Sequence, residues 1–250
     1  MIQDLHSHTY YSFCGKDRPE TVIEAAITGG VEQLGICDHN YGIGLGRSSL
    51  YKSEADFPFD DYGLTLRRYF DHLTLLKEKY ADKINILRGI EIATTLTRPR
   101  TALPDSADVS FFDYALVEHI HEPELSSIHG DLFSFAKRLG CPMGIAHTDL
   151  FEFISAIGEE PLPYLCRMAE FGIFWELNVN FDSIHKYREH EYVKRFFESV
   201  EQQELIRASG LKLSVGFDGH KAHEYLPDRV KYACDKLISL NISMIFEDCN

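Results

Sequence analysis

Ile2-Gln3-Asp4-Leu5-His6-Ser7-His8-Thr9, at the start of the chain, predicts a short strand that carries two histidines. Successive side chains of a strand point to opposite faces, so His6 and His8 should point the same way. Two imidazoles that converge from one strand supply half of a tetrahedral site for zinc, iron or a similar ion. A His-x-His pair alone is also compatible with a polar strand face. The choice between the two interpretations therefore depends on the rest of the chain.

The composition is typical of one large cytoplasmic domain. The 250 residues, 44% of them hydrophobic, fall in the size range of single α/β barrels, and we expect one domain over residues 1–250. The 25 Lys and Arg residues against 39 Asp and Glu give a net charge of −14, which argues against a broad nucleic-acid surface. The six scattered cysteines form no C-x-x-C pair, as expected for a reduced compartment. No signal sequence or long apolar run is present, so we expect neither export nor membrane contact.

Segments that predict strands alternate along the chain with segments that predict helices. After the first strand, we expect strands at residues 33–37, 84–91, 113–120, 142–146, 173–178 and 212–217. Between and after them, we expect helices at residues 19–28, 62–80, 132–139, 162–171, 188–209 and 228–240. Residues 40–60 have neither pattern and are interpreted as a long loop, a candidate lid over a site. This alternation predicts an α/β fold with a parallel sheet.

Imidazoles and carboxylates recur at the predicted strand ends: His6, His8, His39, Glu91, His119, His121, His147, Asp218 and His220. Each has a local explanation of its own, such as a turn or an ion pair. Nearly every strand contributes, however, whereas an open doubly wound sheet concentrates its chemistry at one switch point. In a (β/α) barrel the carboxyl ends of all strands meet at one catalytic face. The set therefore favours a barrel with a multinuclear metal site, in which a carboxylate such as Glu91 bridges two ions.

Six ordered motifs carry a resemblance to a known family. They are Asp4-Leu5-His6-Ser7-His8-Thr9, Cys37-Asp38-His39, Gly89-Ile90-Glu91, His121-Glu122-Pro123, Ala146-His147 and Phe217-Asp218-Gly219-His220. Together they resemble the polymerase and histidinol phosphatase (PHP) family over nearly the whole chain. The resemblance implies a distorted, TIM-like (β/α)7 barrel, two or three divalent ions (zinc, iron or manganese) and hydrolysis of phosphoesters.

The resemblance also implies a set of ligands. The first ion would be held by His6, His8, Glu91 and Asp218, the second by Glu91, His121 and His147, and the third by His39 and His220. His121 is preferred to His119 because Glu122-Pro123 follows it, and His119 is then expected to line the site. The loop after His8 departs from the family pattern, and Asp17 is the expected further ligand of the third ion. Cys14 is interpreted as a packed thiol, since sulfur is a soft ligand.

The expected chemistry is attack on phosphorus by a metal-bound water held by Glu91 and Asp218, which the ions convert to hydroxide. An anionic substrate also needs local cations in so acidic a chain, and Arg18 and Arg47 are the chosen candidates. His185 and His223 are interpreted as exposed.

The leading functional prediction is a metal-dependent phosphatase of a small phosphorylated molecule, similar to histidinol phosphatase. A nuclease of the same family is an alternative, disfavoured by the negative charge. An amidohydrolase is a further alternative. It would usually need a bridging lysine at a strand end, and no predicted strand end has one. A metal-binding regulatory protein without activity is the last alternative, although a scaffold would not need Glu91 and Asp218. The substrate, the identity of the metals and the oligomeric state stay open.

Overall fold

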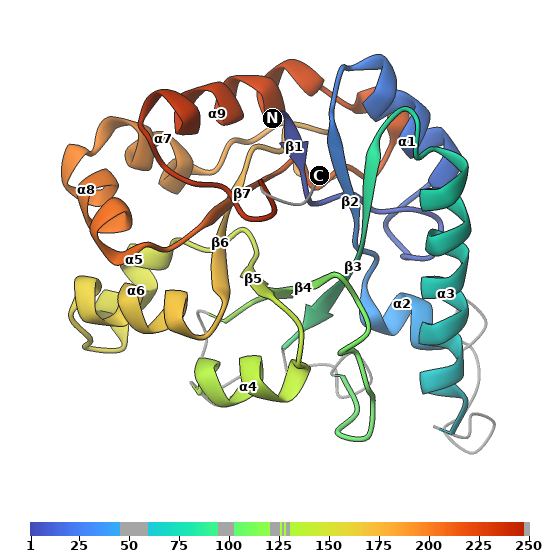
Figure 1. Ribbon diagram of the computed structural model, residues 1–250, viewed down its shortest axis with the longest axis horizontal. Coiled ribbons are helices and arrows are strands. Elements are labelled where there is room, and N and C mark those ends of the chain that lie inside the picture. Colours follow the sequence, from blue (N-terminus) through green and yellow to red (C-terminus); the bar gives the residue numbers. More distant parts are fainter. Residues whose placement is uncertain (46–59, 95–102, 121–125, 127, 129–130, 248–250) are drawn as a thin grey trace.

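Seven parallel strands, in chain order, form the barrel of this protein (Figure 1). The computed structural model describes residues 1–45, 60–94, 103–120, 126, 128 and 131–247. The strands are β1 (Gln3–Asp4), β2 (Gln33–Ile36), β3 (Asn85–Ala93), β4 (Tyr114–Glu118), β5 (Met143–Ile145), β6 (Ile173–Asn178) and β7 (Leu213–Gly216). β7 returns to β1, since Leu5 N donates to Val215 O and His8 N donates to Gly219 O, each at 2.8 Å. The predicted α/β barrel is confirmed.

The helices lie around the outside of the strands (Figure 1). They are α1 (Pro19–Thr28), α2 (Asn40–Leu45), α3 (Asp60–Lys79), α4 (Leu132–Leu139), α5 (Leu150–Ala156), α6 (Pro161–Glu170), α7 (Glu191–Glu198), α8 (Val200–Ser209), the 3-10 helix η3 (Ala222–Glu224) and α9 (Pro227–Ser239). α1 begins with Pro19, whose fixed φ suits a first helical turn, and it buries Ile23 and Ala26. None of the helices in the described ranges is long and apolar enough to cross a membrane.

A small apolar cluster fills the barrel below its polar mouth. It consists of Leu5, Cys37, Leu87, Tyr114, Leu116, Ala146 and Phe174, with Ile245 and Phe246 packed against it. Tyr114 donates its hydroxyl to Leu5 O at 2.6 Å. Gly35 and Gly89 make room for this ring, because a Cβ on either would lie 2.1 Å and 2.4 Å from Tyr114 atoms. The polar mouth therefore rests on an apolar floor that excludes water from below.

Several predicted elements differ from the structure. The predicted loop at residues 40–60 is wrong at its start, where α2 forms, and its remainder up to residue 59, including the candidate lid, lies outside the described residues. The single helix predicted at 188–209 is two helices, because Ser199 leaves the helical conformation and caps α8 by accepting from Gln202 N. α5 was not predicted. β1 is also shorter than expected and ends before His6.

Sharp turns follow three of the strands. His119, His147 and Asp218 have φ values of 59°, 27° and 55°, in the left-handed region that costs non-glycine residues free energy. Each lies directly after, or two residues after, the end of β4, β5 or β7. The surrounding packing holds these turns, and all three side chains line one cavity at the barrel mouth.

Candidate metal centre

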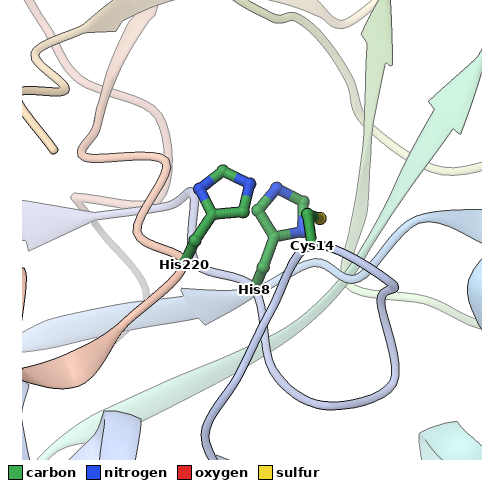
Figure 2. Close-up of side chains that lie close together, drawn as sticks. All are labelled: His8, Cys14 and His220. Carbon is green, nitrogen blue, oxygen red and sulfur yellow. The ribbon is translucent and has the colours of Figure 1, made fainter. Parts of the chain in front are cut away.

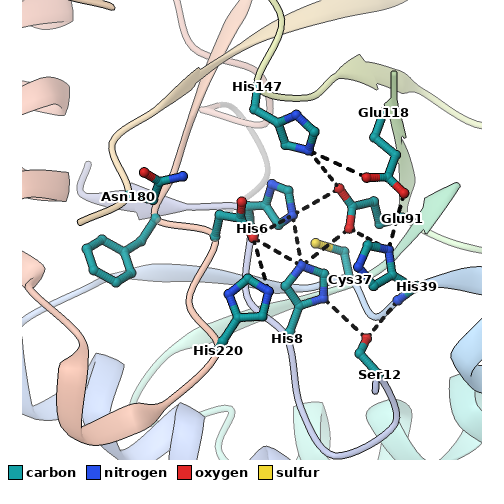
Figure 3. A network of polar contacts seen from close by, with 12 residues as sticks. His6, His8, Ser12, Cys37, His39, Glu91, Glu118, His147, Asn180 and His220 are labelled. Atoms are coloured by element: carbon teal, nitrogen blue, oxygen red, sulfur yellow. Dashed lines mark hydrogen bonds and ion pairs between the residues drawn. The ribbon is translucent and has the colours of Figure 1, made fainter. Parts of the chain in front are cut away.

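Four side chains, from β3 and from the segments that follow β1 and β7, meet at the centre of the barrel mouth. Figure 3 shows His6, His8 and Glu91 of this set. His6 Nε2 and His8 Nε2 lie 3.1 Å apart. Asp218 Oδ1 lies 3.4 Å from His6 Nε2 and 3.2 Å from His8 Nε2. Glu91 reaches the same two nitrogens, each at 3.3 Å. Two imidazoles and two carboxylates thus share one point, as expected for the ligands of a single ion.

Glu91 also takes part in a second group. Its Oε1 lies 3.4 Å from His147 Nε2, and its Oε2 lies 2.9 Å from His39 Nδ1. Glu118, at the end of β4, places Oε2 3.8 Å from His147 Nε2 and Oε1 3.5 Å from His39 Nδ1. Glu91, Glu118 and His147 form a group whose ligand atoms lie within 4.8 Å of one another. Glu91 therefore stands between two groups, where a bridging carboxylate would have to be.

A third group lies at the loop that follows β1. Cys14, His8 and His220 bring one sulfur and two ring nitrogens within 4.8 Å of one another (Figure 2). The ring of His8 stacks between neighbours, with centroids 4.7 Å from His39 and 4.6 Å from His220. The candidate ligands therefore extend from the central group at the barrel mouth to the loop that follows β1.

A layer of carboxylates orients the imidazoles from behind. Glu176 Oε1 accepts from His6 Nδ1 at 2.7 Å, and its Oε2 accepts from His147 N at 2.8 Å. Since a carboxylate only accepts, His6 carries its hydrogen on Nδ1 and presents Nε2 to the centre. Gly216 allows this contact, because a Cβ there would lie 2.1 Å from Glu176 Oε1. Asp182 holds His185 in the same way, through Nδ1 at 2.7 Å.

Another buried carboxylate, Asp38, fixes the loop that follows His8. It accepts from Thr9 N at 2.7 Å, from Thr9 Oγ1 at 2.6 Å and from Ser12 Oγ at 2.7 Å. Ser12 Oγ also lies 3.2 Å from His8 Nδ1, and it accepts from His39 N at 2.8 Å. The histidines of the first two motifs are therefore oriented by one network.

Without metal, the carboxylates and imidazoles control one another's protonation. Burial raises the pKa of Glu91 and Asp218, but the neighbouring imidazoles outweigh it and hold both well below their usual range. Burial lowers the pKa of His147 and His220, but the carboxylates beside them raise these values to about 9 and about 10. His8 is the exception, since burial lowers its pKa to about 3. The metal-free site is thus a buried cluster of ion pairs.

Several atoms of this cluster make ion pairs within it but have no hydrogen-bond partner. Among the buried side-chain atoms of the described residues, these include both oxygens of Glu91, Nδ1 of His39, Oδ2 of Asp182 and Nδ1 of His220. Buried polar atoms without partners cost free energy, so such a set calls for a ligand that the protein alone does not supply. Carboxylate oxygens and imidazole nitrogens are donors that divalent transition metals accept. The residues present therefore fit divalent ions.

A cavity of about 260 Å³ opens over these groups and is lined by histidines and carboxylates. Besides the residues above, it is lined by His119, His185 and His190. No Lys or Arg from the described part of the chain lines it. An anion entering this cavity would meet imidazoles and any bound ions.

The PHP domain family model matches residues 4–245. The chain belongs to the PHP domain family. The expected family is therefore confirmed. The match covers β2 to β7 and every motif on which the resemblance rested.

A sequence relative of this PHP protein and a similar solved structure both come from Lactococcus lactis. Its histidinol-phosphatase is 26% identical over 119 residues, a match that covers 48% of this chain and 39% of the relative's length. A crystal structure of histidinol phosphate phosphatase from that organism, in complex with zinc, L-histidinol and phosphate, has a TM-score of 0.57 at 18% identity. That comparison covers 97% of this chain and 95% of the other. At such low identity it supports the barrel fold.

The structure brings most of the expected ligands of this PHP domain together. His6, His8, His39, Glu91, His147, Asp218 and His220 all lie at the barrel mouth, and His119 lines the cavity. Asp17 belongs to none of the groups found among the described residues, and its Oδ2 accepts from Ala222 N at 2.8 Å. Arg18 is exposed at the start of α1. His121 and Arg47 lie outside the described residues.

The structure adds site residues that the sequence did not single out. Glu118 was assigned to the middle of a strand running to residue 120, but β4 ends at Glu118, so this carboxylate is the strand-end residue. His185 was interpreted as exposed, yet its Nε2 lies 3.1 Å from Asp218 Oδ2 and it lines the cavity. His190 and Asp182 carried no motif and could not have been found from spacing. Glu176 lies inside β6 and is fully buried, and it carried no motif either.

Proposed function

We propose that this protein is a metal-dependent phosphatase that hydrolyses a phosphate monoester of a small molecule, of the histidinol phosphate type. The observation that carries the proposal is the set of buried carboxylate oxygens and imidazole nitrogens without hydrogen-bond partners at the catalytic face of the barrel. Family membership and the Lactococcus lactis relatives support it. A cavity of about 260 Å³ without lysine or arginine in its described lining favours a small substrate over a nucleic acid.

The proposed ligands follow the three groups at the mouth. His6, His8, Asp218 and Glu91 would hold the first ion, and Glu91, Glu118 and His147 the second. His121, outside the described residues, stays a candidate for the second ion. His39 and His220 would hold a third. Zinc, iron or manganese ions held there would lower the pKa of a water molecule and neutralise charge on the phosphoryl oxygens.

The protein's own residues have three tasks in this proposal. Glu91 and Asp218 would orient the attacking water, since their oxygens face the centre where His6 and His8 also point. His119, His185 and His190 line the entrance and would contact the phosphoryl group. Glu176 keeps His6 and His147 in the orientation that the site needs. Arg18 and Arg47 remain the proposed cations for the remainder of the substrate.

A substrate screen tests this proposal. The zinc-loaded protein is assayed with L-histidinol phosphate, other small phosphomonoesters, single-stranded DNA and amide substrates, and the release of phosphate or cleavage product is measured. We expect turnover of at least one small phosphomonoester and its loss after the metal is removed. Cleavage of DNA alone would favour the nuclease, and no turnover of any substrate by a fully metal-loaded protein would favour a binding protein.

A further inference from the structure

The loop between β1 and α1 places a thiol beside two histidines of the third group. The sulfur of Cys14 lies within 4.8 Å of ring nitrogens of His8 and His220 (Figure 2). The ring of His39 stacks on the ring of His8, with centroids 4.7 Å apart. Cys14 comes from a different part of the chain than His39, which follows β2, and His220, which follows β7. Cys14, His8 and His220 therefore converge, and His39 lies next to them against the ring of His8.

The fold fixes this position of the thiol. Gly15 packs so closely under the loop that a Cβ would lie 2.0 Å from Thr9 O. Lys16 N donates to His220 O at 3.0 Å, which joins the loop to the segment that follows β7. Tyr10 N donates to Asp17 O at 2.8 Å and closes the loop on itself. The sulfur is thus held next to His220 by the backbones on both sides.

The carboxylate of the same loop is engaged elsewhere. Asp17 Oδ2 accepts from Ala222 N at 2.8 Å, two residues after His220. Through this bond Asp17 joins the loop to the first residue of η3. In the described structure, Asp17 is in none of the groups that could hold an ion, and Cys14 is in one.

We propose that Cys14 ligates the third ion as a thiolate, together with His39 and His220, in the place where the sequence favoured Asp17. This inference rests on the proposed metal site and deepens it. Binding moves the thiol proton to solvent and forms a sulfur–metal bond. Thiolate sulfur favours zinc or cobalt over manganese. The position of the third ion should therefore discriminate against manganese, whereas the two positions with carboxylate ligands should not.

Cobalt substitution tests the proposal directly. We expect the cobalt-loaded wild-type protein to show the near-ultraviolet charge-transfer band of a thiolate–cobalt bond. In Cys14→Ser the band should vanish, and metal analysis should find about one ion fewer per chain. Asp17→Asn and Cys166→Ser, the latter a partly buried thiol on α6, should keep both the band and the metal content.

A second measurement needs no variant. Alkylation of Cys14, followed by mass spectrometry of the wild-type protein, should be fast without metal and strongly slowed by zinc. Absence of the band in wild type, its persistence in Cys14→Ser, or loss of the ion in Asp17→Asn would each overturn the proposal. Phosphatase activity is measured separately. A protein that shows the band but no turnover would refute the proposed function and would still support Cys14 as a metal ligand.

Discussion

Glu91 is the residue on which the site depends most. It is 1% exposed, and its two oxygens face His6, His8, His39 and His147 without hydrogen-bond partners. A carboxylate in that position can satisfy both oxygens only by sharing them between ions or protonated imidazoles. No other acid of the described residues is a member of two of the groups that could hold a metal.

Replacing Glu91 by Gln should therefore remove metal and activity together. The amide has one acceptor oxygen and cannot bridge, so we expect loss of at least one bound ion and a fall in kcat/KM of about 100-fold or more. Metal analysis and phosphate release measure the two effects. Glu78→Gln, an exposed change on α3, is the control and should leave both unchanged. Normal metal content and activity in Glu91→Gln would refute the bridging role.

Among single residues, those that belong to a motif could be predicted from the sequence. Those whose position depends on the local backbone conformation were missed. His6, His8, His147 and Asp218 follow the ends of their strands, and Glu91 lies two residues before the end of β3. The alternation of strands and helices in the sequence predicts that such residues converge. Glu118 was missed because the left-handed turn at His119 ends the strand two residues early. Cys14 and Asp17 could not be distinguished, since their positions depend on the packing of one loop.

At the scale of the element, the glycines inside the barrel decide how the strands approach. Gly89, in β3, faces the ring of Tyr114, and a methyl group there would lie 2.4 Å from Tyr114 Cζ. Tyr114 is fully buried, so neither ring nor strand has room to move. The strand that delivers Glu91 is positioned by this contact two residues earlier.

Gly89→Ala should therefore destabilise the fold by about 1–3 kcal/mol through overpacking. The matched control is Gly63→Ala in α3, where no atom lies within 4 Å of an added Cβ. That change should raise stability by up to about 1 kcal/mol, because glycine is a poor helix former. Denaturant unfolding of both variants measures the difference. Equal effects of the two substitutions would contradict this account of the barrel interior.

Elements with a complete local pattern were predicted closely, and those that depend on packing were not. α1, α4 and β6 have the predicted bounds, since Pro19, Gly140 and the run at residues 173–178 mark them in the sequence. α2 contains two glycines and has little helical propensity of its own. α5 could have been found, because Asp149 accepts from Glu152 N in a typical helix start.

At the scale of the molecule, protons and metal ions compete for one buried cluster. In the metal-free protein the pKa values of His147 and His220 are raised from 6.5 to about 9 and about 10. Between the unfolded value of 6.5 and these raised values of about 9 and about 10, the folded state binds more protons than the unfolded state. The free energy of unfolding therefore falls as the pH rises through this range. Metal binding requires unprotonated imidazoles, so the stabilisation by zinc should grow over the same range.

The melting temperature with and without zinc measures this competition. At a free zinc concentration of about 100 Kd, the expected stabilisation is about 2.7 kcal/mol, a rise in Tm of about 5–10 °C. The rise at a fixed zinc concentration should be larger at about pH 8.5 than at about pH 6, because protonated imidazoles bind no metal. A rise that is constant or shrinks with pH would show that these histidines are not ligands.

The central claim is that ions held at the barrel mouth make this protein a phosphatase. The most direct measurement is phosphate release from L-histidinol phosphate while zinc is added stepwise to the metal-free protein. The account predicts no release without metal and a rise with each equivalent of bound zinc, up to a plateau at two or three. Equal release before and after complete metal removal would contradict it.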